Sequence, residues 1–120
     1  MLNDAKAFDK VYIACGYTDM RRGIDGLTSL IQTEFHLSPF TPNVLFLFCG
    51  RRTDRIKGLL WEGDGFLLLY KRLEGRNGFR WPRNGQEVAE ISAEQYQWLM
   101  QGLTISPKRT VQKIAPRVVL

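Results

Sequence analysis

One continuous stretch, residues 44–83, constrains the fold most, because it alternates short apolar runs with turn residues. The run Val44–Cys49 is apolar throughout and of strand length, which is typical of a strand covered on both faces. Two more runs of strand length, residues 56–62 and 66–73, flank Gly63-Asp64-Gly65. Glycine tolerates positive φ and Asp caps its own turn, so these three residues predict a hairpin. The whole stretch predicts a β-meander.

The part of the chain before the meander predicts one strand and one helix. Residues 11–15 form an apolar run that Gly16 ends. Apolar side chains then recur at helical spacing, which predicts an amphipathic helix over about residues 20–36. Thr18 and Asp19 are both candidates for its N-cap, since their side-chain oxygens accept hydrogen bonds from free backbone N–H groups.

The part after the hairpin predicts a short strand and a second helix. Residues 79–81 are of strand type and stop at a proline, and a polar stretch follows over residues 83–90. Ser92 and, three residues later, Gln95 form a capping-box pattern. Gly102 stands where the helix that they begin would end.

The order of strand, helix, meander and helix indicates the α+β class. We expect a small antiparallel or mixed sheet of about five strands, with one long helix packed on it and a second C-terminal helix. The place of the first strand in this sheet stays open. A chain of 120 residues has the size of one domain, which we assign to residues 1–105.

Residues 106–120 form a basic C-terminal tail in this interpretation. The tail holds no acid, and its cations are Lys108, Arg109, Lys113 and Arg117. Such a segment buries too little surface to offset its ordering entropy, so we expect an extended arm that adds phosphate contacts. Truncation after residue 105 should then leave thermal stability nearly unchanged, whereas a large loss would indicate that the tail docks.

Positive charge is concentrated in the meander. Residues 44–83 hold nine basic residues and four acids, a difference of five, which equals the formal net charge of the whole chain. A confined basic segment favours an acidic partner such as DNA, although a solvated charged face is the alternative. The side chains that we expect to contact phosphates are Arg51, Arg52, Arg55, Lys57, Lys71, Arg72, Arg76 and Arg80, and Arg21 and Arg22 could add to them.

Aromatic side chains allow two interpretations. Beside arginines they can stack on unpaired bases, as in proteins that bind single strands. In a small sheet they can equally form the core. The residues concerned are Tyr12, Tyr17, Trp61, Phe66, Tyr70, Phe79, Trp81 and Trp98.

Signals of catalysis and of cofactors are weak. His36 is the single histidine, and the two cysteines have no metal-binding spacing, so we predict no metal, no cofactor and no catalytic residue. The best alternative is a magnesium site of Asp54, Glu62 and Asp64, although a turn and a salt bridge explain the same residues. No apolar run has the roughly 20 residues of a membrane span. With no signal peptide expected and the thiols free, we expect a cytoplasmic protein.

An ordered set of short motifs resembles a known family. It begins with Thr18-Asp19-Met20-Arg21-Arg22-Gly23. The other pieces are VYIACG at residues 11–16, DGL at 25–27, PF at 39–40, LFLF at 45–48, RRTDRIK at 51–57, DGF at 64–66, KRLE at 71–74 and FRWP at 79–82. This set resembles the small accessory protein, often called TnpB, of the insertion sequence sixty-six family of bacterial mobile elements, which is distinct from the RNA-guided nuclease of the same name.

The resemblance implies an accessory role in DNA transposition, beside a separate transposase that carries the catalytic acids. Our first hypothesis is a non-catalytic protein that binds DNA, such as the element ends, through its basic surface. The second is a protein-interaction module that bridges transposase subunits, with Asp19, Arg21 and Arg22 as the partner-binding residues. The third is a metal-dependent enzyme of nuclease type. The oligomeric state stays open.

Overall fold

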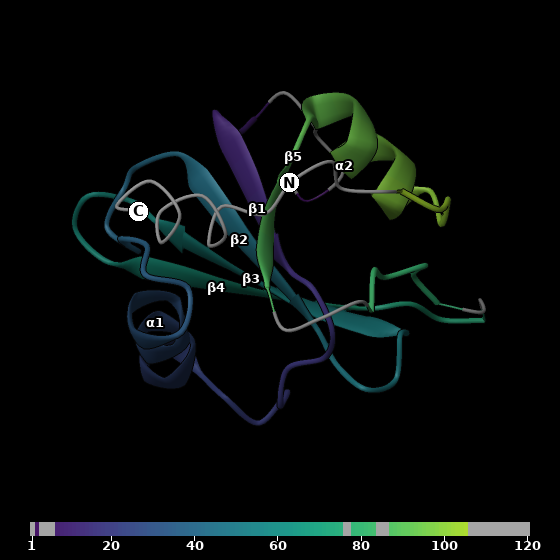
Figure 1. Ribbon diagram of the computed structural model, residues 1–120, viewed down its shortest axis with the longest axis horizontal. Coiled ribbons are helices and arrows are strands. Elements are labelled where there is room, and N and C mark those ends of the chain that lie inside the picture. The colour runs from purple at the N-terminus through teal and green to yellow at the C-terminus, as the bar shows by residue number, and fades with distance from the viewer. Residues whose placement is uncertain (1, 3–6, 76–77, 84–86, 106–120) are drawn as a thin grey trace, which may run out of the picture.

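The structure is a computed structural model, and it describes residues 2, 7–75, 78–83 and 87–105. Five strands form one mixed sheet in the order β4-β3-β2-β1-β5 (Figure 1). Strands β1 and β2 are parallel, and the other neighbours are antiparallel. The strands are β1 (Lys10–Ala14), β2 (Val44–Cys49), β3 (Arg55–Trp61), β4 (Phe66–Arg72) and β5 (Val88–Ile91). The α+β class and a mixed sheet of five strands are therefore confirmed.

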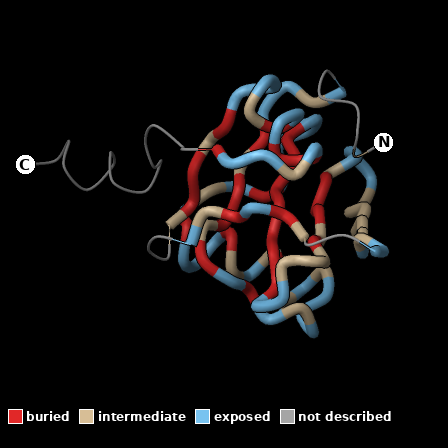
Figure 2. The backbone as a smooth tube through the Cα atoms, turned by 90° about the vertical axis from the view of Figure 1, so that its right-hand side faces the viewer, coloured by how far each residue is buried: buried red, intermediate tan, exposed pale blue. Residues whose placement is uncertain are grey.

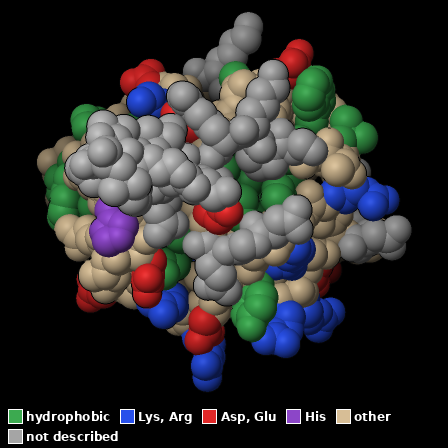
Figure 3. Space-filling view, in the orientation of Figure 1, with side chains coloured by type: hydrophobic (Ala, Val, Ile, Leu, Met, Phe, Trp, Pro, Cys, Tyr) green, Lys and Arg blue, Asp and Glu red, His purple; other side chains and the backbone are tan. Residues whose placement is uncertain are grey.

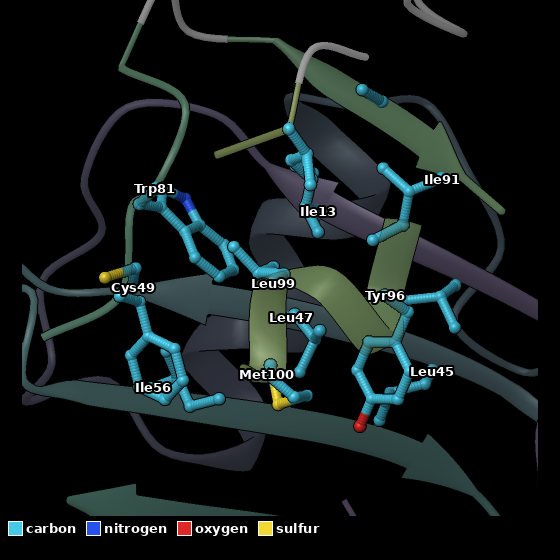
Figure 4. Close-up of a cluster of buried hydrophobic side chains, with 14 residues drawn as sticks. Ile13, Leu45, Leu47, Cys49, Ile56, Trp81, Ile91, Tyr96, Leu99 and Met100 are labelled. Atoms are coloured by element: carbon cyan, nitrogen blue, oxygen red, sulfur yellow. The ribbon is translucent and has the colours of Figure 1, made fainter. Parts of the chain in front are cut away.

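The sheet is covered on both faces by one helix each, α1 (Ile24–Thr33) and α2 (Ala93–Met100) (Figure 1). Figure 4 shows side chains of α2, among them Tyr96 and Leu99, pointing toward those of the central strands. Leu27 and Ile31 of α1 pack on the opposite face. Every residue of β2 is buried, because β2 has a helix on each side. Figure 2 shows in red the buried segments of the chain inside the molecule. The prediction for β2 is confirmed.

Helix α1 begins at Ile24, later than the sequence predicted, and has ten residues. Its N-cap is Gly23, which has no side-chain hydrogen bond, so neither N-cap candidate fills that position. Asp19 instead accepts a hydrogen bond from the backbone N–H of Arg21 at 2.9 Å. This bond holds residues 19–21 in a separate turn before the helix, and the apolar periodicity starts only at Ile24. Residues 17–23 therefore form a loop.

The strand predicted at residues 79–81 is wrong, and the fifth strand is β5. Phe79 and Trp81 are buried but pair with no strand. The Phe79 N–H donates to the Thr53 carbonyl at 2.7 Å, and the Trp81 indole donates from its side chain to the carbonyl of Ala14 in β1 at 2.8 Å. Strand β5 has only four residues, one of them Glu90, and its first three lie in the predicted polar stretch. A strand this short gives too few positions for a period of two to show.

The predicted hairpin and the predicted caps of the second helix are present. The turn at residues 63–65 joins β3 and β4. Ser92 and Gln95 form the capping box of α2, and Gly102 has the left-handed conformation that ends this helix, with φ of 84°. In the described part of the chain, no helix is both long and apolar enough to span a membrane. The predicted tail at residues 106–120 lies outside the described residues.

Candidate nucleic-acid interface

Two loops meet at one edge of the sheet because β1 and β2 are parallel neighbours. One loop, residues 17–22, follows β1, and the other, residues 50–54, follows β2. The N–H of Thr18 donates to the Cys49 carbonyl at 2.8 Å, which continues the pairing beyond β1. The loops approach so closely that a Cβ atom at Gly50 would lie 2.7 Å from Cγ of Met20.

The guanidinium of Arg83 joins the backbone at the start of the two loops. It donates from Nη1 to the Gly16 carbonyl at 2.7 Å and from Nη2 to the Gly50 carbonyl at 2.8 Å, with a longer contact of 3.2 Å to the Arg51 carbonyl. Sequence reasoning gave Arg83 no role. No spacing could have shown it, since all three acceptors are backbone atoms from distant segments.

Lys57 of β3 holds the first loop through two hydrogen bonds. Its ammonium donates to the carbonyls of Met20 at 2.6 Å and of Arg22 at 2.9 Å. An ammonium has three donors, so these two bonds use most of its capacity. Lys57, which we expected to contact phosphates, therefore also positions residues 20–22.

Two adjoining depressions lie over these loops, and together they form what we term the cationic site. The first has a volume of about 420 Å³ and is lined by Tyr17, Thr18, Asp19, Met20, Arg21, Gly50, Arg51, Arg52 and Arg55. The second, of about 540 Å³, is lined by Asp19, Met20, Arg21, Arg55, Lys57, Leu68 and Tyr70. They share four residues, including Arg21 and Arg55. Figure 3 shows Lys and Arg side chains gathered in the lower right of the molecule, with acids among them.

An ion pair between Asp19 and Arg21 stands at the junction of the depressions. Nη2 of Arg21 lies 2.8 Å from Oδ2 of Asp19, and Nε lies 3.0 Å from Oδ1. The side chain of Arg21 is nonetheless 92% exposed. Its hydrogen bond lowers the pKa of Asp19 to about 2, so the carboxylate is ionised at neutral pH.

A second carboxylate, Asp54, lies between two arginines of the site. Nε of Arg55 is 3.1 Å from Oδ1 of Asp54, and Nη2 of Arg52 is 3.7 Å from Oδ2. The hydrogen bond from Arg55 lowers the pKa of Asp54. The cationic site thus has five cations, Arg21, Arg51, Arg52, Arg55 and Lys57, near two carboxylates, and its charge is positive.

Two of the aromatic candidates flank the site, and several others are core. Tyr17 is 49% exposed; Cζ of Arg51 lies 4.4 Å from its ring centroid, and Nη2 of Arg51 donates to its hydroxyl at 2.7 Å. Tyr70 is 53% exposed, with the Lys57 ammonium 5.9 Å from its ring centroid. By contrast, Phe79 and Trp81 are buried.

A buried polar residue, Thr18, with 7% of its surface exposed, lines the first depression and also a neighbouring one. Within the described part of the chain, its hydroxyl has no hydrogen-bond partner. Buried polar groups nearly always have one. Sequence reasoning treated Thr18 only as a helix cap and did not place it in a site.

The predicted phosphate-binding residues lie on two faces. Arg51, Arg52, Arg55 and Lys57 line the cationic site. Arg72 pairs with Arg55 across β3 and β4, so it lies beside the site, where its Nε bonds Glu74 at 2.8 Å.

The other predicted cations lie elsewhere. Lys71 pairs with Ile56, which packs in the core under α2, so Lys71 points to the opposite face. Arg80 lines a separate depression at the end of α2. Arg76 lies outside the described residues. The predicted partner-binding residues Asp19 and Arg21 join the cationic site, and Arg22 adjoins it.

The three carboxylates of the alternative magnesium site are far apart. Asp54 precedes β3, whereas Glu62 and Asp64 follow it. A strand of seven residues spans about 20 Å, so no single ion can bind all three. Across residues 2, 7–75, 78–83 and 87–105, no three His, Cys, Asp or Glu side chains are grouped closely enough to hold a metal ion.

Comparison with known proteins gives a family match that includes the whole cationic site. The family model described as IS66 Orf2 like protein matches residues 9–110. The uncharacterized protein y4hO of Sinorhizobium fredii is 37% identical over 94 residues, which cover 78% of this chain and 80% of that protein. The uncharacterized protein y4jC of the same organism is 30% identical over 94 residues, covering 78% and 79%. No solved structure matches the chain.

Proposed function

The chain belongs to the IS66 Orf2-like family, which is associated with transposition, and we propose that it is a non-catalytic accessory protein that binds DNA through the cationic site. One observation carries this proposal. Arginines from two loops about 30 residues apart converge on one concave surface. The side chains of Arg83 and Lys57 donate hydrogen bonds to backbone carbonyls of these loops and fix their positions.

Arginine suits this role for a physical reason. The guanidinium is always charged and offers several donors in one plane, which fits two oxygens of a phosphate. Each phosphate that is neutralised releases condensed counterions, so the affinity falls as salt rises. The two carboxylates of the site lower its charge, and Arg21, Arg52 and Arg55 bind them, which leaves a net positive surface.

The proposed partners are DNA at the element ends and the transposase of the same element. The transposase supplies the chemistry in this proposal, because the length of β3 separates Asp54 from Glu62 and Asp64. A magnesium-dependent nuclease would need such acids together.

The salt dependence of DNA binding tests the proposal. A labelled duplex with the sequence of an element end is titrated with protein at several salt concentrations, and fluorescence anisotropy is measured. If about five phosphates are neutralised, log K should fall against log salt with a slope of about −4 to −5. The variant Lys10→Ala serves as a charge control, because Lys10 begins β1 at the end away from the loops. Absence of binding at low salt contradicts the proposal.

A second candidate function is a protein-interaction module, and the exposed turn at residues 19–22 favours it. The ion pair of Asp19 and Arg21 stands largely in solvent, with side-chain exposures of 44% and 92%. Arg22 is also exposed, and its Nη1 reaches the Gly26 carbonyl at 3.2 Å. Co-purification with the transposase should then be lost in the double variant Arg21→Ala, Arg22→Ala. Equal recovery of wild type and variant would count against this surface.

A further inference from the structure

We infer that the cationic site takes unpaired nucleotides of single-stranded DNA, with one base on Tyr17, the next on Tyr70 and the phosphate between them on Arg21 and Arg55. This rests on the proposed function and names its substrate class.

The arrangement of the two depressions supports this assignment. Tyr17 lines the first depression and Tyr70 the second, while Arg21 and Arg55 line both. A cationic junction thus stands between two aromatic walls. This is the order of groups in one step of a single strand, where a phosphate joins two bases.

The two tyrosines have the exposure that base stacking requires. Each is about half exposed, whereas core aromatics of this sheet such as Phe79 and Trp81 are almost fully covered. Each also has a cation near its ring, at 4.4 Å for Arg51 on Tyr17 and 5.9 Å for Lys57 on Tyr70. Aromatic side chains beside a basic track are the usual means by which proteins hold unpaired bases without reading sequence.

Thr18 adds a hydrogen-bond donor to the first depression. It is a buried polar residue that lines this depression, and its hydroxyl has no partner among the described residues. A phosphate oxygen or a base acceptor bound in the depression could accept a hydrogen bond from this hydroxyl. Buried polar groups nearly always have a partner, and a nucleotide bound here would supply one.

The carboxylate of Asp19, which lines both depressions, does not prevent a phosphate from binding Arg21. Asp19 uses Nε and Nη2 of Arg21, which leaves Nη1 of the same guanidinium to donate to a phosphate oxygen. Duplex DNA could place a phosphate on these donors, but its bases are stacked inside the helix and cannot reach the tyrosines. The tyrosines therefore distinguish single strands from duplex.

The experiment compares three ligands of one sequence: a short single strand, the blunt duplex, and the duplex with an unpaired 3′ overhang. Affinities are measured by anisotropy for wild type, Tyr70→Ala and the matched control Tyr70→Phe, which keeps the ring. We expect the single strand and the overhang to bind more tightly than the blunt duplex. Tyr70→Ala should weaken single-strand binding by about 5- to 150-fold and weaken duplex binding much less, while Tyr70→Phe stays close to wild type.

Folding controls keep the test decisive. Tyr70 lies on the edge strand β4, so its removal opens no core, and thermal unfolding checks this. If Tyr70→Ala is unfolded, Tyr17→Ala in the loop replaces it with the same expected loss. Thr18→Val, which keeps the shape and removes the hydroxyl, should weaken single-strand binding as well.

Other outcomes overturn the inference in distinguishable ways. If single strand and duplex bind equally and neither tyrosine variant changes either, the inference fails while the proposed function stands. If no DNA binds, the proposed function fails too. Tighter binding of an RNA of the same sequence than of the DNA strand would assign the site to RNA and overturn the assignment to DNA.

Discussion

At the scale of single residues, the cations of the interface divide into two kinds. Arg83 and Lys57 donate to backbone carbonyls and hold the loops in place. Arg21 and Arg52 have side chains that are 92% and 78% exposed, so solvent or a phosphate can reach them. Both kinds carry the same charge, so they are distinguished by substitutions that change hydrogen bonding and charge separately.

Replacing Asp19 by asparagine should strengthen DNA binding. The amide oxygen can still accept the hydrogen bond from the Arg21 N–H, so the turn is kept, while the negative charge that occupies the guanidinium is removed. The freed guanidinium can neutralise one more phosphate, so the salt slope should steepen by about 0.9. Because the pKa of Asp19 is about 2, a change of pH near neutrality cannot replace this substitution. Weaker binding at low salt, in a variant with unchanged thermal unfolding, would contradict this role.

Replacing Arg83 by lysine should destabilise the fold without changing its charge. An ammonium at this position cannot reach the carbonyls of Gly16 and Gly50 together in the planar geometry of a guanidinium. We expect a loss of about 1 kcal/mol in the free energy of unfolding, measured by urea denaturation. Arg80→Lys is the matched control, since Arg80 is exposed and makes no hydrogen bond or ion pair in the described part of the chain. Equal stability of the two variants would show that the hydrogen bonds of Arg83 do not stabilise the fold.

At the scale of elements, the sequence predicted local structure well and pairing poorly. The apolar run of β2, the glycine turn after β3 and the capping box of α2 each depend on neighbouring residues, and each is present. Strand β5 was missed and the start of α1 was placed too early. Tertiary pairing forms β5 from only four residues, and a local hydrogen bond of Asp19 holds residues 19–21 in a turn outside the helix.

Replacing Gly50 by alanine should disturb the site without changing any charge. The new Cβ would lie 2.7 Å from Cγ of Met20, so the Met20 side chain or the loop that carries it must shift. We expect weaker DNA binding and a flatter salt slope, measured by anisotropy. Gly65→Ala is the matched control, because nothing lies within 4 Å of a Cβ there and no positive φ is required. Unchanged binding by a folded Gly50→Ala protein would show that loop contact does not shape the site.

At the scale of the whole molecule, the cationic site depends on the crossover that places β1 beside β2. This parallel pairing brings residues 17–22 against residues 50–54, and no local pattern in the sequence indicates it. Sequence reasoning therefore listed Arg51 as a phosphate contact and Arg21 as a partner-binding residue that could add to the phosphate contacts, without placing the two side by side. The same sheet divides the predicted cations, with Arg55 on the face of α1 and Lys71 on the face of α2.

One measurement tests the central claim, that the cationic site is the surface that binds DNA. Two double variants, each lacking two cations, are compared in the salt dependence of binding to the same DNA: Arg51→Ala, Arg52→Ala on the cationic site, and Lys71→Ala, Arg80→Ala on the opposite face. Both are first shown to be folded by thermal unfolding. We predict that the first variant flattens the salt slope by about 1.8 and that the second leaves it unchanged. An equal or greater loss in the second variant, or none in the first, would contradict the account.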